Sequence, residues 1–145
     1  MEDTVVMTMK IALMMNLLLF PMTVAAGPLI SFKNDVYPIL QNYCASCHSP
    51  NGIGYEKSGF SVRNYASVMK GTKYGAVVVS GSSLTSNLIW LIGHHADASI
   101  AMPKTCTQES KDSHVCLQAS KSAHWLPKPE VRLIEDWVNQ GAKDN

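Results

Sequence analysis

Two cysteines and a histidine stand close together at Cys44, Cys47 and His48, in the order C-x-x-C-H. This spacing is typical of covalent haem attachment. Each thiol can add to a vinyl group of the porphyrin as a thioether, and two intervening residues let both sulfurs reach one edge of the ring. The histidine then faces the iron and can bind it through a neutral imidazole nitrogen. The motif therefore predicts one covalent haem c per chain, held by Cys44 and Cys47, with His48 as an axial ligand.

Two other uses of a cysteine pair are less favoured by the sequence. A thioredoxin-like redox pair lies near a βαβ pattern, and no such pattern is visible. A structural zinc site needs four ligands, so a second C-x-x-C or a spaced histidine pair would be expected. Cys106 and Cys116 are ten positions apart and His94 and His95 are adjacent, which is not the usual ligand spacing.

The segments beside the motif must position it. Apolar side chains share one helical face at Phe32, Val36, Ile39, Leu40 and Tyr43. We therefore expect a helix over 31–43 that runs directly into the motif, with Pro38 as a bend. Residues 49–62 are rich in Gly, Ser, Pro and Asn and predict a loop. In that loop the carbonyl of Pro50 is the expected acceptor for the second ring nitrogen of His48.

Further helices are expected after this loop. Asn64 is a suitable cap for a short helix that runs through Met69 and ends at Gly71. The apolar run 76–79 favours an extended backbone. Ser83 is a suitable cap for a third helix that reaches Ile92. The side chains expected to be buried on that helix are Leu84, Leu88, Leu91 and Ile92.

The C-terminal part combines a long irregular segment with a final helix. Residues 93–127 are polar and irregular, and a loop of that length is usually functional or stapled. A last helix begins near Pro129, where proline at the first position is favourable, and ends at Gly141. Its apolar face contains Val131, Leu133, Ile134, Trp137 and Val138, and we expect Trp137 to pack against Phe32 or Tyr43. The fold class predicted by these elements is all-α.

The order of these fragments resembles a known family. The chain carries Phe32, Asp35, Val36, Pro38, Ile39 and Leu40 before the motif, then Asn64-Tyr65, Lys70-Gly71, Val78-Val79-Ser80-Gly81, Ser86-Asn87-Leu88, Met102-Pro103 and 134–142. From about residue 31 onward it resembles the class I cytochrome c fold, and more narrowly the planctomycete-type bacterial cytochrome c domain. The resemblance implies crossed N- and C-terminal helices around one covalent haem. Ser80 departs from the usual proline, and the loop 104–127 after the Met-Pro pair is longer than usual.

The sixth iron ligand is expected at Met102. The resemblance implies this role, because the Met-Pro pair of the family supplies the distal ligand, and methionine is a common partner of histidine in electron carriers. Met69 lies on an apolar helix face and is expected to fill the core. The alternative ligands are His94 or His95, while His114 and His124 are expected to be loop residues.

Cys106 and Cys116 are expected to form a disulfide. An exported chain meets an oxidising compartment, where free thiols are uncommon. Closing this loop would stabilise the fold by about 2.5–3 kcal/mol in the chain-entropy model. A redox-active disulfide is the alternative, but no C-x-x-C spacing supports it.

Residues 1–26 have the pattern of a cleaved signal peptide, and 27–145 would form the cytochrome c domain. Lys10 precedes an apolar run over 11–20, and small residues lead to a cut after Ala26. Translation could begin at Met1, Met7 or Met9. The apolar stretch is short for a bilayer span of roughly 20 residues, so an uncleaved anchor is the less favoured alternative.

The expected function is one-electron transfer outside the cytoplasm, in the periplasm, by a protein that is not an enzyme. The partners would be redox proteins, with no stable membrane insertion after cleavage. A haem enzyme or sensor with a displaceable sixth ligand is the alternative. The net charge of about +2 after loss of Lys10, Glu2 and Asp3 is too small to indicate nucleic-acid binding. A group of four cations, Lys57, Arg63, Lys70 and Lys73, is more simply a solvated face than a docking patch.

Overall fold

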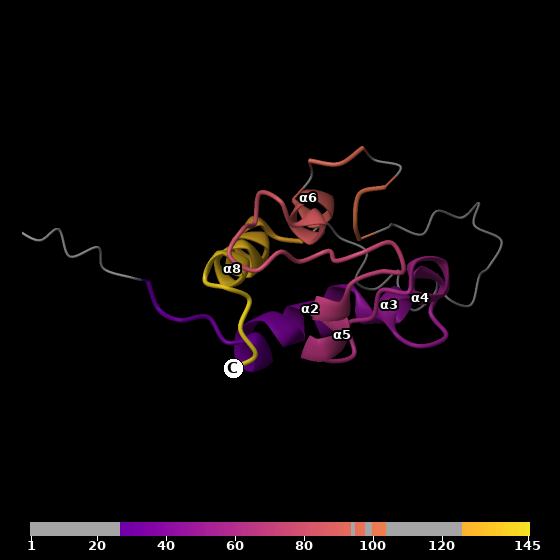
Figure 1. The fold of residues 1–145 in the computed structure, drawn as a ribbon, viewed down its shortest axis with the longest axis horizontal. Coiled ribbons are helices and arrows are strands. Elements are labelled where there is room, and N and C mark those ends of the chain that lie inside the picture. Colours follow the sequence, from indigo (N-terminus) through magenta and orange to yellow (C-terminus); the bar gives the residue numbers. More distant parts are fainter. Residues whose placement is uncertain (1–26, 94, 98–99, 104–125) are drawn as a thin grey trace, which may run out of the picture.

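The computed structural model describes residues 27–93, 95–97, 100–103 and 126–145 (Figure 1). Within these ranges the chain is helical and has no strand, apart from an isolated antiparallel bridge between Thr72 and Gly75. The predicted all-α class is therefore confirmed for the described part of the chain. The expectations for 1–26 and for His94, Cys106, His114, Cys116 and His124 lie outside the described residues.

The N-terminal helix forms as expected, with one irregularity. A π-helical turn η1 (Phe32–Val36) leads directly into α2 (Tyr37–Tyr43), and the hydroxyl of Ser31 accepts a hydrogen bond from the N–H of Asn34 at 3.2 Å. The wider turn lies just before Pro38, which has no N–H to donate to the preceding turn. Pro38 then stands in the first turn of α2, where that missing donor costs nothing.

The C-terminal helix α8 (Lys128–Asn139) packs against η1. Trp137 is fully buried, and its ring centroid lies 5.4 Å from that of Phe32. The indole N–H of Trp137 donates to the carbonyl of Lys143 at 3.0 Å, so its polar edge is satisfied. The predicted contact between Trp137 and Phe32 is confirmed.

Replacing Trp137 by alanine should destabilise the protein by about 3–5 kcal/mol, because a large, fully buried aromatic side chain is removed from a packed core. Urea unfolding followed by circular dichroism measures this change. Leu84→Ala is the control: Leu84 is 94% exposed, so the change should stay within about 0.5 kcal/mol. Equal effects of the two substitutions would contradict the described packing.

The expected loop over 49–62 is wrong in part, because it contains the helix α4 (Ile53–Ser58). The hydroxyl of Ser58 donates to the carbonyl of Gly54 at 2.6 Å inside this helix. Gly59 ends it in the left-handed conformation, with φ at 75°. Glycine lowers helix propensity, which is why the sequence indicated a loop, but here packing against the motif helix overrides propensity.

The two middle helices agree with the sequence to different degrees. Helix α5 (Tyr65–Lys70) begins as predicted, since the side chain of Asn64 accepts from the N–H of Ser67 at 2.9 Å. Helix α6 (Asn87–Ile92) begins later than predicted, after Ser86. The predicted burial of Leu84 is therefore wrong, because Leu84 lies in the turn before the helix and is exposed.

The side chain of Ser86 explains the late start of α6. The hydroxyl of Ser86 donates to the carbonyl of Ser82 at 2.7 Å and accepts from the N–H of Val79 at 2.8 Å. The turn at 82–86 is thus closed by side-chain bonds before the helix can begin. The expected extended run 76–79 is not helical, and it pairs with no strand in the described part of the chain.

Candidate functional site

The C-x-x-C-H motif forms one short helix at the end of α2. Helix α2 ends at Tyr43, directly before the motif as predicted, and helix α3 (Ala45–His48), which was not predicted, follows Cys44 at once. The N–H of Cys44 donates to the carbonyl of Leu40 at 2.9 Å, and the N–H of His48 donates to the carbonyl of Cys44 at 2.8 Å. Residues three and four apart share a helix face, so Cys44, Cys47 and His48 lie on one side of this turn.

Both thiols of the motif are free and half-buried. Burial, and to a smaller degree the neighbouring Cys47, raises the pKa of Cys44 to about 12. A catalytic dithiol needs the opposite shift, because the thiolate is the attacking form. The environment of Cys44 therefore argues against a thioredoxin-like pair.

His48 is held by the backbone of Phe60. The Nδ1 atom of His48 lies 3.3 Å from the carbonyl oxygen of Phe60, and the two rings meet edge to face with centroids 5.2 Å apart. A proton on Nδ1 satisfies this contact and leaves the lone pair of Nε2 for a metal. Burial lowers the pKa of His48, and the carbonyl of Phe60 opposes this in part. The neutral, metal-binding form of the ring is thereby favoured.

The prediction that the carbonyl of Pro50 accepts from the ring of His48 is wrong, because the carbonyl of Phe60 takes this place. Pro50 is exposed in the turn after α3, and the chain then forms α4 and returns to the motif. The N–H of Val62 donates to the carbonyl of His48 at 2.9 Å, which fixes this return. Phe60 was missed in the sequence because its position depends on the unexpected helix.

Two glycines that the sequence analysis did not single out allow the close packing of α4 on the motif. A side-chain carbon at Gly54 would lie 2.8 Å from Cε1 of His48, and one at Gly52 would collide with the carbonyl of Cys47. A larger residue at either position must displace the motif. The signal that could have indicated this packing is the position of the two glycines, Gly52 and Gly54, shortly after His48.

A tyrosine links the motif to α8. Partial burial, and then the negative charge of Glu130 at the start of α8, raises the pKa of the Tyr43 hydroxyl. Tyr43 immediately precedes Cys44. The first turn of α8 is thus tied to the start of the motif by a side-chain contact.

Met102 lies on the segment that follows α6. It is half-buried against the core, and its N–H donates to the carbonyl of Leu91 at 2.9 Å. Met69 is also half-buried against the core, as expected for a packing residue. His95, an alternative ligand, is exposed, and its ring lies against Trp90 with centroids 5.6 Å apart.

These residues fit a covalently bound haem. Two free thiols occupy one helical turn, and Nδ1 of the adjacent His48 is held by the carbonyl of Phe60. Two thiols and one histidine are the groups needed for thioether attachment and for one protein ligand to the iron. No group of three or more His, Cys, Asp or Glu side chains that could hold a metal ion occurs among the described residues.

Comparison with known families identifies the region around the motif. Residues 44–105 match the family described as Planctomycete cytochrome C, so the resemblance drawn from the sequence is confirmed. The matched span includes the C-x-x-C-H motif and Met102. Cytochrome c domains bind haem c covalently and pass electrons to redox partners. No match was found among curated proteins or among solved structures.

In the described ranges no helix is long and apolar enough to cross a membrane.

Proposed function

Residues 44–105 match the planctomycete-type cytochrome c family, and we propose that the protein is a monohaem electron carrier and not an enzyme. The observation that carries the proposal is the ring of His48, whose Nδ1 faces the carbonyl of Phe60 at 3.3 Å. That contact leaves Nε2 as the free ligand atom directly beside two free thiols.

Each residue of the site has a separate role. Cys44 and Cys47 would hold the haem through thioethers, and Nε2 of His48 would be one of the two protein ligands of its iron. Met102 would supply the second ligand through its sulfur, and its segment is fixed by the hydrogen bond to the carbonyl of Leu91. Phe60 is a positioning residue, since it contacts the imidazole of His48 and has no ligand atom for the iron.

The fold is a class I arrangement, in which the helices at the two ends of the domain cross beside the haem. The packing of α8 on η1 through Trp137 and Phe32 supports it. Figure 1 shows α8 beside the start of the N-terminal helix, while α3 and α4 lie at its far end. The aromatic contact therefore braces the helix that carries the motif.

When bound, haem supplies a one-electron couple at its iron. With His48 and Met102 as its ligands, the iron would have no coordination position left for a substrate. Transfer takes place outside the cytoplasm, in the periplasm, after removal of residues 1–26, and a Cys106–Cys116 disulfide closes the loop after Met102. The four cations noted above are exposed.

Optical and magnetic spectra of the purified protein test this function. We expect low-spin iron in the ferric and ferrous states and little binding of carbon monoxide, because both axial positions are taken. A high-spin ferric protein that reacts rapidly with peroxide would favour the haem enzyme or sensor instead.

Replacing Gly54 by alanine should weaken the bond between His48 and the iron. The added carbon would lie 2.8 Å from the imidazole, so the ring must move off the carbonyl of Phe60. We expect a high-spin fraction in the magnetic spectrum of the ferric protein. Glu56→Ala on the exposed side of the same helix is the control and should leave the spectrum unchanged. Identical spectra for the two variants would contradict the proposed packing of α4 on the ligand.

A further inference from the structure

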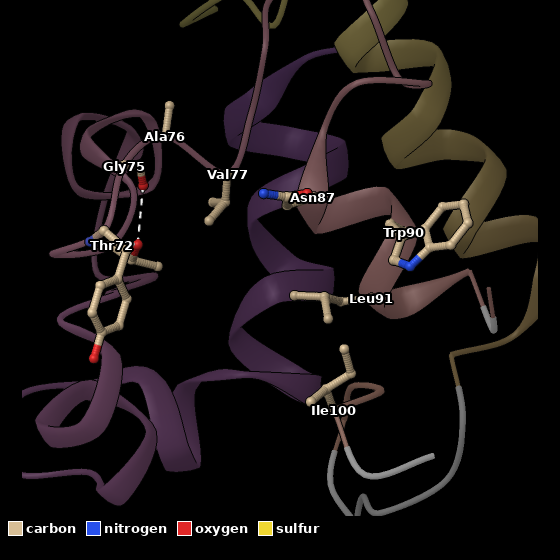
Figure 2. Close-up of a pocket in the computed structure, with 9 residues that line it drawn as sticks. Thr72, Gly75, Ala76, Val77, Asn87, Trp90, Leu91 and Ile100 are labelled. Atoms are coloured by element: carbon tan, nitrogen blue, oxygen red, sulfur yellow. Dashed lines mark hydrogen bonds between the residues drawn. The ribbon is translucent and has the colours of Figure 1, made fainter. Parts of the chain in front are cut away.

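An open pocket of about 480 Å³ lies between the bend at 72–77 and helix α6 (Figure 2). Its size is that of a typical cofactor site. The lining residues are Thr72, Tyr74, Gly75, Ala76, Val77, Asn87, Trp90, Leu91 and Ile100. Apart from Leu91, whose carbonyl holds the Met102 segment, the proposed function assigns no role to these residues.

The pocket borders the segment of the proposed distal ligand. Leu91 lines it, and the carbonyl of Leu91 accepts the N–H of Met102. Ile100, two residues before Met102, lines it as well. Figure 2 shows Val77, Leu91 and Ile100 around the same space, so this part of the lining is apolar. A planar porphyrin bound to Met102 would find apolar contacts there.

The thioether residues are absent from the pocket. Neither Cys44 nor Cys47 is among the lining residues, and neither is His48. The vinyl groups that thioethers use lie on one side of the porphyrin, and the two propionates lie on the opposite side. A pocket that adjoins Met102 but not the cysteines is therefore placed for the propionate edge.

A propionate needs hydrogen-bond donors when it is partly removed from water. The hydroxyl of Thr72 is already bonded to the carbonyl of Gly75 at 3.1 Å. The amide of Asn87 points into the pocket in Figure 2, and no hydrogen bond joins it to another residue of the described part of the chain. Asn87 is thus the lining side chain with a free amide donor.

We propose that this pocket receives the propionate edge of the haem and that the side-chain amide of Asn87 donates a hydrogen bond to one propionate. The inference rests on the proposed function, because it requires a covalently bound haem. It adds a positioning residue on α6, in the same helix as Leu91, which holds the Met102 segment. One short helix would then fix both the distal ligand and the carboxylate side of the cofactor.

The test compares Asn87→Leu, which removes the donor, and Asn87→Asp, which keeps the shape and adds a negative charge. Asn34→Leu and Asn34→Asp, at an exposed position on η1, are the matched controls. Two quantities are measured on the purified haem protein: the propionate carboxylate bands in redox-difference infrared spectra, and the reduction potential. A change in helix packing alone would not shift the carboxylate bands.

Both Asn87 variants should shift a propionate band, and Asn87→Asp should lower the potential, because added negative charge stabilises ferric iron. The Asn34 variants should match the wild type. Propionate bands that stay unshifted in both Asn87 variants, in protein that retains low-spin haem, would overturn the inference and leave the proposed function intact. A wild-type protein with no Soret absorption would overturn both.

Discussion

Replacing Met102 by alanine should convert a low-spin haem protein into one with an open iron site. The thioether sulfur is a soft ligand that favours ferrous iron, so its loss should lower the reduction potential. Axial ligands set haem potentials over a range of about 0.8 V, and we expect a sizeable part of that range to be lost. Redox titration gives the potential, and the charge-transfer band of the His–Met ferric haem in the near infrared should disappear.

Met69→Ala is the matched control, because Met69 is also half-buried against the core. It should leave the spectrum unchanged. It should lower the free energy of unfolding by no more than about 5 kcal/mol, because it creates a cavity in the core. An unchanged spectrum in Met102→Ala would place the distal ligand elsewhere. His95→Ala, at the alternative ligand within the described residues, would then be the next variant to examine.

Replacing either cysteine of the motif should leave the haem attached by one bond or not at all. Cys44→Ala and Cys47→Ala each remove one thioether, and the remaining bond no longer fixes the edge of the porphyrin beside His48. Haem-dependent absorbance after a denaturing gel measures covalent attachment, and its yield should fall steeply in both variants. Ser46→Ala, at the exposed position between the two cysteines, should keep full attachment.

Full covalent attachment in both cysteine variants would contradict the assignment of these residues. Loss in Ser46→Ala as well would show that the motif helix tolerates no substitution, and the cysteine results would then carry no weight. The control keeps the effect of losing a sulfur separate from damage to α3.

The motif and the two end helices could be predicted because their signals are local. The C-x-x-C-H spacing depends on adjacent residues, and the faces of the first and last helices repeat with helical periodicity. The contact between Trp137 and Phe32 followed from these faces. Both signals lie in short stretches of sequence and do not require knowledge of distant contacts.

The surroundings of His48 could not be predicted from the sequence, since they depend on tertiary contacts. The helix α4 forms in a glycine-rich stretch, where local preference indicates a loop. Its glycines allow close approach to the motif, and the chain after it brings the carbonyl of Phe60 to the imidazole. The residues next to the histidine indicated Pro50 as the acceptor, because a local pattern carries no information about a contact made through α4.

The late start of α6 has a similar cause. Ser83 has the side chain of a helix cap, but the hydroxyl of Ser86 closes the turn first through Ser82 and Val79. Both serines are consistent with a cap by residue type, so the choice between them depended on a contact with Val79, seven residues away from Ser86.

The most direct test of the central claim is the mass of the tryptic peptide that spans residues 34–57, between the cleavage sites at Lys33 and Lys57. It is measured after denaturation and treatment with a thiol alkylating reagent, in protein isolated from cells that mature c-type cytochromes. We expect a peptide that carries the mass of one haem and has no alkylated cysteine. A peptide with both Cys44 and Cys47 alkylated, or joined in a disulfide, and without haem would contradict it.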